Sequence, residues 1–204
     1  METTLEIIGL SKIYNQKEAV KNISFKVKKN EIVGILGPNG CGKTTTIGMI
    51  LGLLKPSKGK VLIDGIEIEK KRVELLNHLN FISPYIELPK KLTVKQNLEV
   101  YGRLYDVKNL KEKIENLSEK LRLNKIINKI TGELSSGQKN RVSLAKSIIN
   151  DPKVLLLDEP TASLDPETGD FVRSFLENYQ KEKETSILLA SHNMLEVERL
   201  CSSV

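Results

Sequence analysis

Residues 37–44 read Gly37-Pro38-Asn39-Gly40-Cys41-Gly42-Lys43-Thr44 and follow the apolar run Ile32-Val33-Gly34-Ile35-Leu36. They match the phosphate-binding P-loop pattern, in which glycines let backbone N–H groups point inward around a phosphate. Lys43 supplies charge for the β- and γ-phosphates, and the Thr44 hydroxyl is a hard oxygen ligand suited to Mg²⁺. A strand, a tight loop and a helix are therefore predicted, with a nucleoside triphosphate bound by residues 37–44 and Thr45.

Composition narrows the class of protein. The chain has 204 residues, 39% of them hydrophobic, and we expect a single domain over residues 1–204. No apolar run approaches the roughly 18 residues that a membrane span needs, so a cytoplasmic chain is expected. The net charge is +6, but aromatic residues make up only 4% and Trp is absent, so no nucleic-acid partner is expected. Cys41 and Cys201 are interpreted as ordinary thiols.

The first 65 residues favour strands. Residues 5–8 and 23–27 alternate apolar and polar side chains, which predicts a small antiparallel sheet beside the P-loop, and Val61-Leu62-Ile63 is a third strand-like run. Tyr14 is placed between the first two strands. Its ring has two interpretations on spacing alone, either stacking on a base or covering the edge of the sheet.

A helical insertion is predicted next. Thr93-Val94-Lys95-Gln96 fits a capping box, and apolar residues recur three or four positions apart from Leu98 to Tyr105 and from Ile114 to Leu121. We place these helices between residues 92 and 130, in a subdomain that covers about residues 86–138.

Alternation of helix and strand then resumes. A helix is predicted over residues 141–149, followed by the continuous apolar strand Val154-Leu155-Leu156-Leu157, which is typical of a parallel sheet covered on both faces. Asp165 is the expected N-cap of a further helix, and residues 187–190 form the last strand. The predicted fold is α/β, with a P-loop NTPase core, a mostly parallel sheet, an N-terminal antiparallel β subdomain and an inserted α-helical subdomain.

Polar residues follow two of the predicted strands. Asp158 and Glu159 come directly after the buried strand, at the edge where parallel sheets place their ligands. Asp158 is a candidate Mg²⁺ ligand, and Glu159 is a candidate base that orients a water and accepts its proton. His192, at the next strand end, either caps a loop or contacts the γ-phosphate.

Residues 134–138, Leu134-Ser135-Ser136-Gly137-Gln138, form a second helix N-terminus suited to an anion. One phosphate chain within one copy of the fold does not require two such sites. Two copies that face each other would use both.

The order of these motifs resembles the nucleotide-binding domain of ATP-binding cassette (ABC) transporters along nearly the whole chain. Residues 37–44 are similar to its Walker A motif, residues 134–138 to its signature loop, and residues 154–159 to Walker B with the adjacent glutamate. Ser163-Leu164-Asp165 resembles the D-loop, and His192 resembles the switch histidine. The signature loop between the two Walker motifs makes the match specific.

The resemblance implies a head-to-tail dimer in which ATP lies between the P-loop of one copy and the signature loop of the other. Tyr14 then corresponds to the aromatic residue that stacks on adenine, and Glu159 to the general base. Ser135, Ser136, Gly137, Gln138 and Asp165 would contact the nucleotide from the partner copy. Thr44 and Asp158 would hold Mg²⁺, and Lys43 and His192 would contact the γ-phosphate.

The sequence departs from the family at three places. Ser136 stands where the family usually has Gly, and Ser83, Pro84 or Tyr85 stands where the family has the Q-loop Gln. The sequence stops at Val204, where the family normally adds strands, so we expect those strands to be absent.

We expect an ATPase subunit of an ABC transporter, peripheral to the membrane through a separate transmembrane subunit. Residues 88–94 and 163–167 are similar to the subfamily of ABC-2-type exporters. Two alternatives stay open from the residues: a soluble ABC ATPase that acts on DNA or ribosomes, and a nucleotide-binding subunit with weak hydrolysis.

Overall fold

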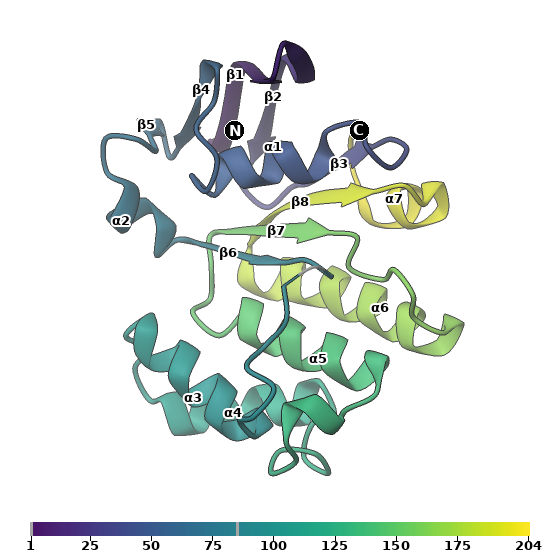
Figure 1. Ribbon diagram of the computed structural model, residues 1–204. Coiled ribbons are helices and arrows are strands. Elements are labelled where there is room, and N and C mark those ends of the chain that lie inside the picture. The colour runs from purple at the N-terminus through teal and green to yellow at the C-terminus, as the bar shows by residue number, and fades with distance from the viewer. Residues whose placement is uncertain (1, 85) are drawn as a thin grey trace.

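The computed structural model describes residues 2–84 and 86–204, and its strands form two four-stranded sheets. The sheets lie one above the other, with helix α1 (Lys43–Ile50) between them and the other long helices below the second sheet (Figure 1). α1 contacts β2 (Lys17–Lys28) of the upper sheet. It also contacts β7 (Val154–Asp158) and β8 (Ser186–Ser191) of the lower one. The helix that follows the P-loop therefore joins both layers.

The upper sheet is antiparallel and has the order β2-β1-β4-β5. Its strands are β1 (Thr3–Tyr14), β2 (Lys17–Lys28), β4 (Lys58–Ile63) and β5 (Ile66–Glu67). The predicted antiparallel sheet is confirmed, but β1 and β2 are each twelve residues long. The sequence underestimated them because Gly9, at φ +57°, lies where the register shifts and the alternation breaks. Tyr14 is consequently the last residue of β1.

The lower sheet is parallel and has the order β3-β8-β7-β6. Its strands are β3 (Ile32–Leu36), β8 (Ser186–Ser191), β7 (Val154–Asp158) and β6 (Leu79–Ile82). Leu36 pairs with Ser191, and Asp158 pairs with Ala190. The carboxyl ends of β3, β8 and β7 therefore meet. Parallel sheets bind their ligands at this edge.

Every residue of β7 and β8 is buried, as the continuous apolar runs predicted. Alternate side chains enter two cores. Leu156 and Leu188 pack toward α1 and the upper sheet, whereas Leu155 and Leu189 pack toward the helices below. This double burial fixes the register of the strands that carry the polar residues at their ends.

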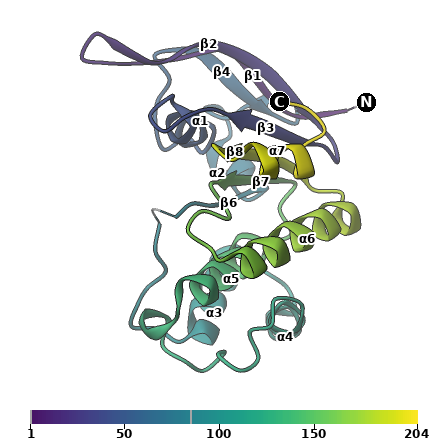
Figure 2. The same ribbon diagram turned by 90° about the vertical axis from the view of Figure 1, so that its right-hand side faces the viewer.

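The helices below the sheet are α5 (Ser136–Ser147) and α6 (Pro166–Lys183), and α3 (Val94–Leu104) and α4 (Leu110–Lys120) lie farther from it (Figure 2). Three shorter helices complete the described chain: α2 (Arg72–Leu76), η1 (Thr131–Glu133) and α7 (Met194–Leu200). The capping box predicted at Thr93 and Gln96 is present. The Asp165 cap before Pro166 is also present.

The prediction for α5 was wrong at its start. The sequence placed the helix over residues 141–149, but it begins at Ser136, because Ser135 and Gln138 form a second capping box. The first turn carries polar side chains, so the apolar spacing becomes visible only from Val142.

The predicted fold class is confirmed: an α/β core with a parallel sheet carries an antiparallel sheet and inserted helices. Helices within residues 2–84 and 86–204 are too short or too polar to cross a bilayer.

Ser202 and Ser203 run beside β3, where Ser202 N donates to Ile32 O and Gly34 N donates to Ser203 O.

Candidate nucleotide-binding site

The P-loop joins the end of β3 to the start of α1 in one tight turn. Gly42 has φ +102°, and a Cβ at this position would lie 2.4 Å from the carbonyl oxygen of Ala19. A side chain at Gly42 would therefore collide with β2 in addition to straining the backbone. The requirement for glycine comes from the packing of the loop against the upper sheet.

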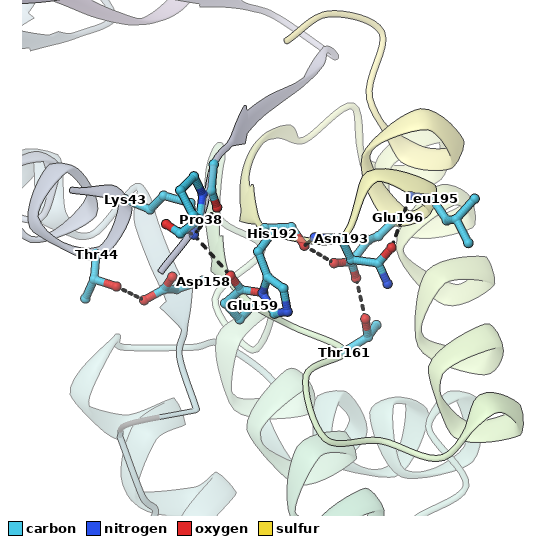
Figure 3. A network of polar contacts seen from close by, with 12 residues as sticks. Pro38, Lys43, Thr44, Asp158, Glu159, Thr161, His192, Asn193, Leu195 and Glu196 are labelled. Carbon is cyan, nitrogen blue, oxygen red and sulfur yellow. Dashed lines mark hydrogen bonds and ion pairs between the residues drawn. The ribbon is translucent and has the colours of Figure 1, made fainter. Parts of the chain in front are cut away.

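Lys43 points into the loop and is only 6% exposed. Its Nζ donates to Gly37 O at 2.6 Å and to Pro38 O at 3.2 Å, and it lies 3.4 Å from Glu159 Oε1. The ammonium group is thus held between the loop and the end of β7 (Figure 3). A fixed positive charge at this place suits an incoming phosphate chain.

Thr44 and Asp158 meet across the gap between α1 and β7. Thr44 Oγ1 donates to Asp158 Oδ2 at 2.9 Å, and Ser83 Oγ donates to the same oxygen at 3.4 Å. Burial of Asp158, together with the nearby charge of Glu159, raises the pKa of its carboxyl group, although the Thr44 hydrogen bond opposes the rise. The charged form of the Asp158 carboxyl group is therefore disfavoured relative to that of an exposed aspartate.

The geometry fits a divalent cation. Asp158 Oδ1 is buried, and within the described chain no group donates a hydrogen bond to it. A cation would satisfy this oxygen and favour the charged carboxylate. Nowhere in residues 2–84 and 86–204 do three or more His, Cys, Asp or Glu side chains gather as a metal cage. This donor set suits Mg²⁺, which takes one or two protein oxygens together with phosphates and waters.

Glu159 and His192 form the second polar pair. Glu159 Oε2 lies 2.8 Å from His192 Nδ1, while Oε1 faces Lys43 (Figure 3). The Glu159 side chain is 10% exposed and that of His192 is 52% exposed. The pair therefore presents a carboxylate with a partly exposed imidazole at the mouth of the site, an arrangement that can orient a water and accept its proton.

Tyr14 is 44% exposed at the end of the β1–β2 hairpin. Lys12 Nζ lies 5.0 Å from the centre of its ring, a cation–π distance. Asn15 and Gln16 turn the hairpin with positive φ angles and leave the ring at its tip. Of the two interpretations from sequence, the exposed ring favours stacking on a ligand.

Residues 135–138 lie at the N-terminus of α5, below the parallel sheet, whereas the P-loop and α1 lie above it (Figures 1 and 2). Ser135 Oγ accepts from Gln138 N at 3.3 Å, and Gln138 Oε1 accepts from Ser135 N at 3.1 Å. No hydrogen bond or ion pair of the described residues joins this loop to residues 37–45. The two candidate phosphate sites of one copy are therefore not joined by polar contacts, although Ser136 lines a cavity together with Asp158 and Glu159.

Ser135 and Ser136 are exposed at this helix start. Because the Ser135 hydroxyl oxygen is the acceptor in the cap, its hydrogen can be directed to another oxygen. Gly137 packs near Thr168, so a Cβ at this position would lie 3.2 Å from the Thr168 methyl group. Asp165 is exposed and caps α6 by accepting from Thr168 N at 2.9 Å. Hydrogen bonds from Thr168 lower the pKa of Asp165.

A cavity of about 300 Å³ opens beside the two carboxylates. It is lined by Ser83, Pro84 and Leu88, by residues of α5, and by Asp158 and Glu159. Ser83 thus occupies the place beside Asp158 at the end of β6. Of the three residues that sequence alignment placed opposite the Q-loop Gln, Tyr85 lies outside the described residues.

The sequence missed two residues that hold the site. Ser191 O accepts from Gly37 N at 3.3 Å, which joins the end of β8 to the P-loop. Asn140 Nδ2 donates to Pro160 O at 2.8 Å and holds the loop after Glu159. Ser191 could have been found as the last residue of a buried strand, whereas Asn140 lies in the polar first turns of α5 and carries no such signal.

A family profile described as "ABC transporter" matches residues 20–162. ABC transporter ATP-binding protein NatA of Bacillus subtilis is 38% identical over 190 residues, which cover 92% of this chain and 77% of NatA.

Two further curated relatives are longer than the chain. Nod factor export ATP-binding protein I of Rhizobium johnstonii is 39% identical, over 97% of this chain and 64% of its own length. Bacitracin transport ATP-binding protein BcrA of Bacillus licheniformis is 34% identical, over 100% of this chain and 66% of its own length. The chain thus spans about two thirds of these relatives.

Solved structures share the fold. One described as the ATP-binding subunit of an ABC transporter has a TM-score of 0.90 and 28% identity, over 99% of this chain and 85% of its own. Another, cbiO1 from Clostridium perfringens, is described as part of the ABC transporter complex cbiONQ. It has a TM-score of 0.84 and 31% identity, over 98% of this chain and 83% of its own.

Proposed function

The chain belongs to the ABC transporter family of ATP-binding proteins, and from this premise we propose that it drives export through a separate membrane subunit. As a member of the family it binds and hydrolyses ATP. The direction is inferred from the name of one relative, which refers to Nod factor export.

The observation that carries the assignment of the catalytic site is the chain of contacts Lys43–Glu159–His192 where β3, β7 and β8 end. We assign Glu159 as the base for the attacking water and His192 as its partner. Lys43 contacts the γ-phosphate, so that catalysis consists mainly of positioning and charge stabilisation. Thr44 and Asp158 would hold Mg²⁺, which when bound supplies positive charge against the β- and γ-phosphate oxygens.

Residues 135–138 form a second helix start suited to an anion and make no polar contact with the P-loop within the described chain, which supports a composite site. We propose that ATP lies between the P-loop of one copy and residues 135–138 of another, with Asp165 near the same junction. Tyr14 would stack on the adenine ring. ATP binding would close this head-to-tail dimer, and hydrolysis would open it.

The cavity beside Asp158 and Glu159 supports a route to the membrane subunit. Ser83 and Leu88 line this cavity together with the two carboxylates. A helix of the membrane subunit that packs against Ser83 and Leu88 would be displaced when the carboxylates move. We propose this cavity as the path by which hydrolysis is coupled to transport.

Turnover of ATP by the purified chain tests the assignment. Glu159→Gln keeps the shape of the side chain but removes the base, so kcat is expected to fall about 100-fold or more while ATP still binds. Glu198→Gln is the matched control, because Glu198 is exposed on α7. Equal turnover by wild type and Glu159→Gln would remove Glu159 as the base.

Sedimentation with ATP tests the composite site in the slowly hydrolysing Glu159→Gln background. Ser135→Arg is expected to abolish the ATP-dependent dimer and to leave ATP binding by the monomer nearly unchanged. Asn116→Arg, on the exposed face of α4, carries the same added charge as a control. Loss of monomer binding in Ser135→Arg would contradict the composite site.

Recovery from cells tests the alternative function. The transporter assignment predicts that the chain is recovered with the membrane fraction together with a multi-helix membrane protein. Recovery with ribosomes or DNA and without membranes would contradict it.

A further inference from the structure

Glu196 is a buried carboxylate that lies close to the catalytic pair. It belongs to α7 and is only 2% exposed. Thr161 Oγ1 donates to Glu196 Oε1 at 2.6 Å, and Ser191 Oγ donates to Glu196 Oε2 at 2.7 Å (Figure 3). Both carboxylate oxygens therefore hold hydroxyl groups from other segments of the chain.

The two hydroxyl groups stand next to the proposed catalytic residues in the sequence. Thr161 follows Glu159 by two positions, and Ser191 directly precedes His192. His192 Nδ1 in turn lies 2.8 Å from Glu159 Oε2. The contacts form a closed ring that runs through Glu159, Thr161, Glu196, Ser191 and His192 and back to Glu159.

Local hydrogen bonds fix the orientation of the groups in this ring. Ser191 Oγ accepts from Asn193 N at 3.1 Å, so its own hydrogen is left to point at Glu196. On the other side, the loop after Glu159 is tight, because Glu159 N donates to Ala190 O at 2.8 Å and Ala162 N donates to Glu159 O at 3.1 Å. These bonds join the loop to the end of β8.

A buried carboxylate is costly unless its hydrogen bonds compensate. No ion pair with Lys, Arg or His involves Glu196 among the residues that the structure describes. It is held by two short bonds of the charge-assisted kind and by its position in the first turn of α7. An apolar side chain would fill the same space at lower cost, so a bridging role accounts for the carboxylate better than packing does.

We propose that Glu196 is a positioning residue for ATP hydrolysis. It ties the loop that follows Glu159 to the end of β8 and thereby fixes Glu159 and His192 at contact distance. The inference rests on the proposed roles of Glu159 and His192. The same set of contacts extends to the P-loop, because Ser191 O accepts from Gly37 N.

Steady-state ATP hydrolysis by Glu196 variants tests the proposal. Glu196→Ala breaks both bonds and is expected to lower kcat at least about tenfold, while the KM for ATP stays within about threefold, because small misplacements act on the chemical step. Glu196→Gln is expected to keep kcat within about threefold, since its amide can accept from one hydroxyl and donate to the other. Glu198→Ala, on the exposed face of α7, is the control.

A double-mutant cycle separates positioning from general stability. Thr161→Val cuts one bond at a partly exposed residue, whereas Thr161→Ser keeps the hydroxyl group. If the ring acts as one unit, Thr161→Val combined with Glu196→Ala lowers kcat no further than Glu196→Ala alone. If Glu196→Ala does not fold, the comparison of Thr161→Val with Thr161→Ser decides, with a loss of about threefold or more expected only for valine.

Thermal unfolding measured on the same samples identifies a purely structural role. A Glu196→Ala protein that melts earlier but keeps wild-type kcat while folded would overturn the proposal, and so would a glutamine variant as slow as the alanine one. Wild-type and Glu159→Gln rates in the same assay distinguish a failure of the proposed function from a failure of the proposed role of Glu196. An inactive wild type contradicts the proposed function, whereas an inactive Glu159→Gln beside a fully active Glu196→Ala contradicts only the role of Glu196.

Discussion

Lys146 offers a test of the electrostatics of a buried charge on α5. It lies on α5 and is 9% exposed, and burial lowers its pKa to about 8 from an ordinary 10.5. Its Nζ donates to Asn80 Oδ1 at 3.1 Å and lies 4.8 Å and 5.1 Å from the ring centres of Phe81 and Tyr101. No carboxylate forms an ion pair with it within the described chain.

The consequence for stability follows from proton binding. Above about pH 8 the folded protein releases the Lys146 proton, whereas the unfolded chain keeps it until about pH 10.5, so the unfolded state binds more protons. The free energy of unfolding should therefore rise with pH through this window. The two pKa values give a gain of about 2.5 kcal/mol from this one group between pH 7 and pH 10.

Urea unfolding of wild type and Lys146→Met at these two pH values isolates the effect, because all other titrating groups cancel in the difference. At pH 7 the methionine variant should be more stable by about 1–2 kcal/mol, since the cost of the buried charge, about 3 kcal/mol, exceeds the lost hydrogen-bond and cation–π contacts. At pH 10 this advantage should vanish or reverse. Lys111→Met, at an exposed site on α4, is the control and should show no such trend. A difference between wild type and Lys146→Met that is constant within about 0.5 kcal/mol from pH 7 to pH 10 would refute the reasoning.

Two further predictions concern nucleotide affinity and the core. Tyr14→Ala should weaken ATP binding about tenfold through lost stacking, and Tyr14→Phe should bind normally. Calorimetry with tripolyphosphate, which has no base, should show equal affinity for all three proteins, and a matching loss there would argue against stacking. Leu156→Ala in the centre of β7, at 0% exposure, should lower the free energy of unfolding by about 3–4 kcal/mol, measured by urea denaturation. Leu104→Ala, at 72% exposure on α3, should cost less than about 0.5 kcal/mol, and similar losses for both would contradict the assignment of the core.

The parts of the fold that sequence could predict are those with a local physical cause. The glycines at residues 37–42 and the apolar run of β7 act through backbone freedom and double burial, so each is visible within a few residues. The start of α5 was missed because its first turn is stabilised by capping and carries polar side chains. Periodicity reports burial and is silent where a helix begins outside the core.

α7 shows why the ring around Glu196 could not be found in this way. Apolar Met194 and Leu195 are 52% and 76% exposed, whereas the charged Glu196 between Leu195 and Val197 is 2% exposed. A hydrophobic pattern predicts the opposite arrangement. The side chain is buried because hydroxyl groups 35 positions upstream and five positions upstream converge on it, and that convergence exists only once β7 and β8 lie side by side.

Ser83 bears on how Asp158 presents itself to a metal. The sequence resemblance sets Ser83, Pro84 or Tyr85 opposite the family's Q-loop Gln, and of these Ser83 donates its hydroxyl hydrogen to Asp158 Oδ2, the oxygen that also accepts from Thr44. Two hydroxyl groups, one directly after β6 and one on α1, therefore hold one carboxylate oxygen and orient the other. Oδ1 is the buried oxygen without a hydrogen bond in the described chain, so it is the atom that would bind the cation under the proposed function. Because Ser83 lines the same cavity as Asp158 and Glu159, a movement of Ser83 would change the hold on Asp158 directly, through this hydrogen bond.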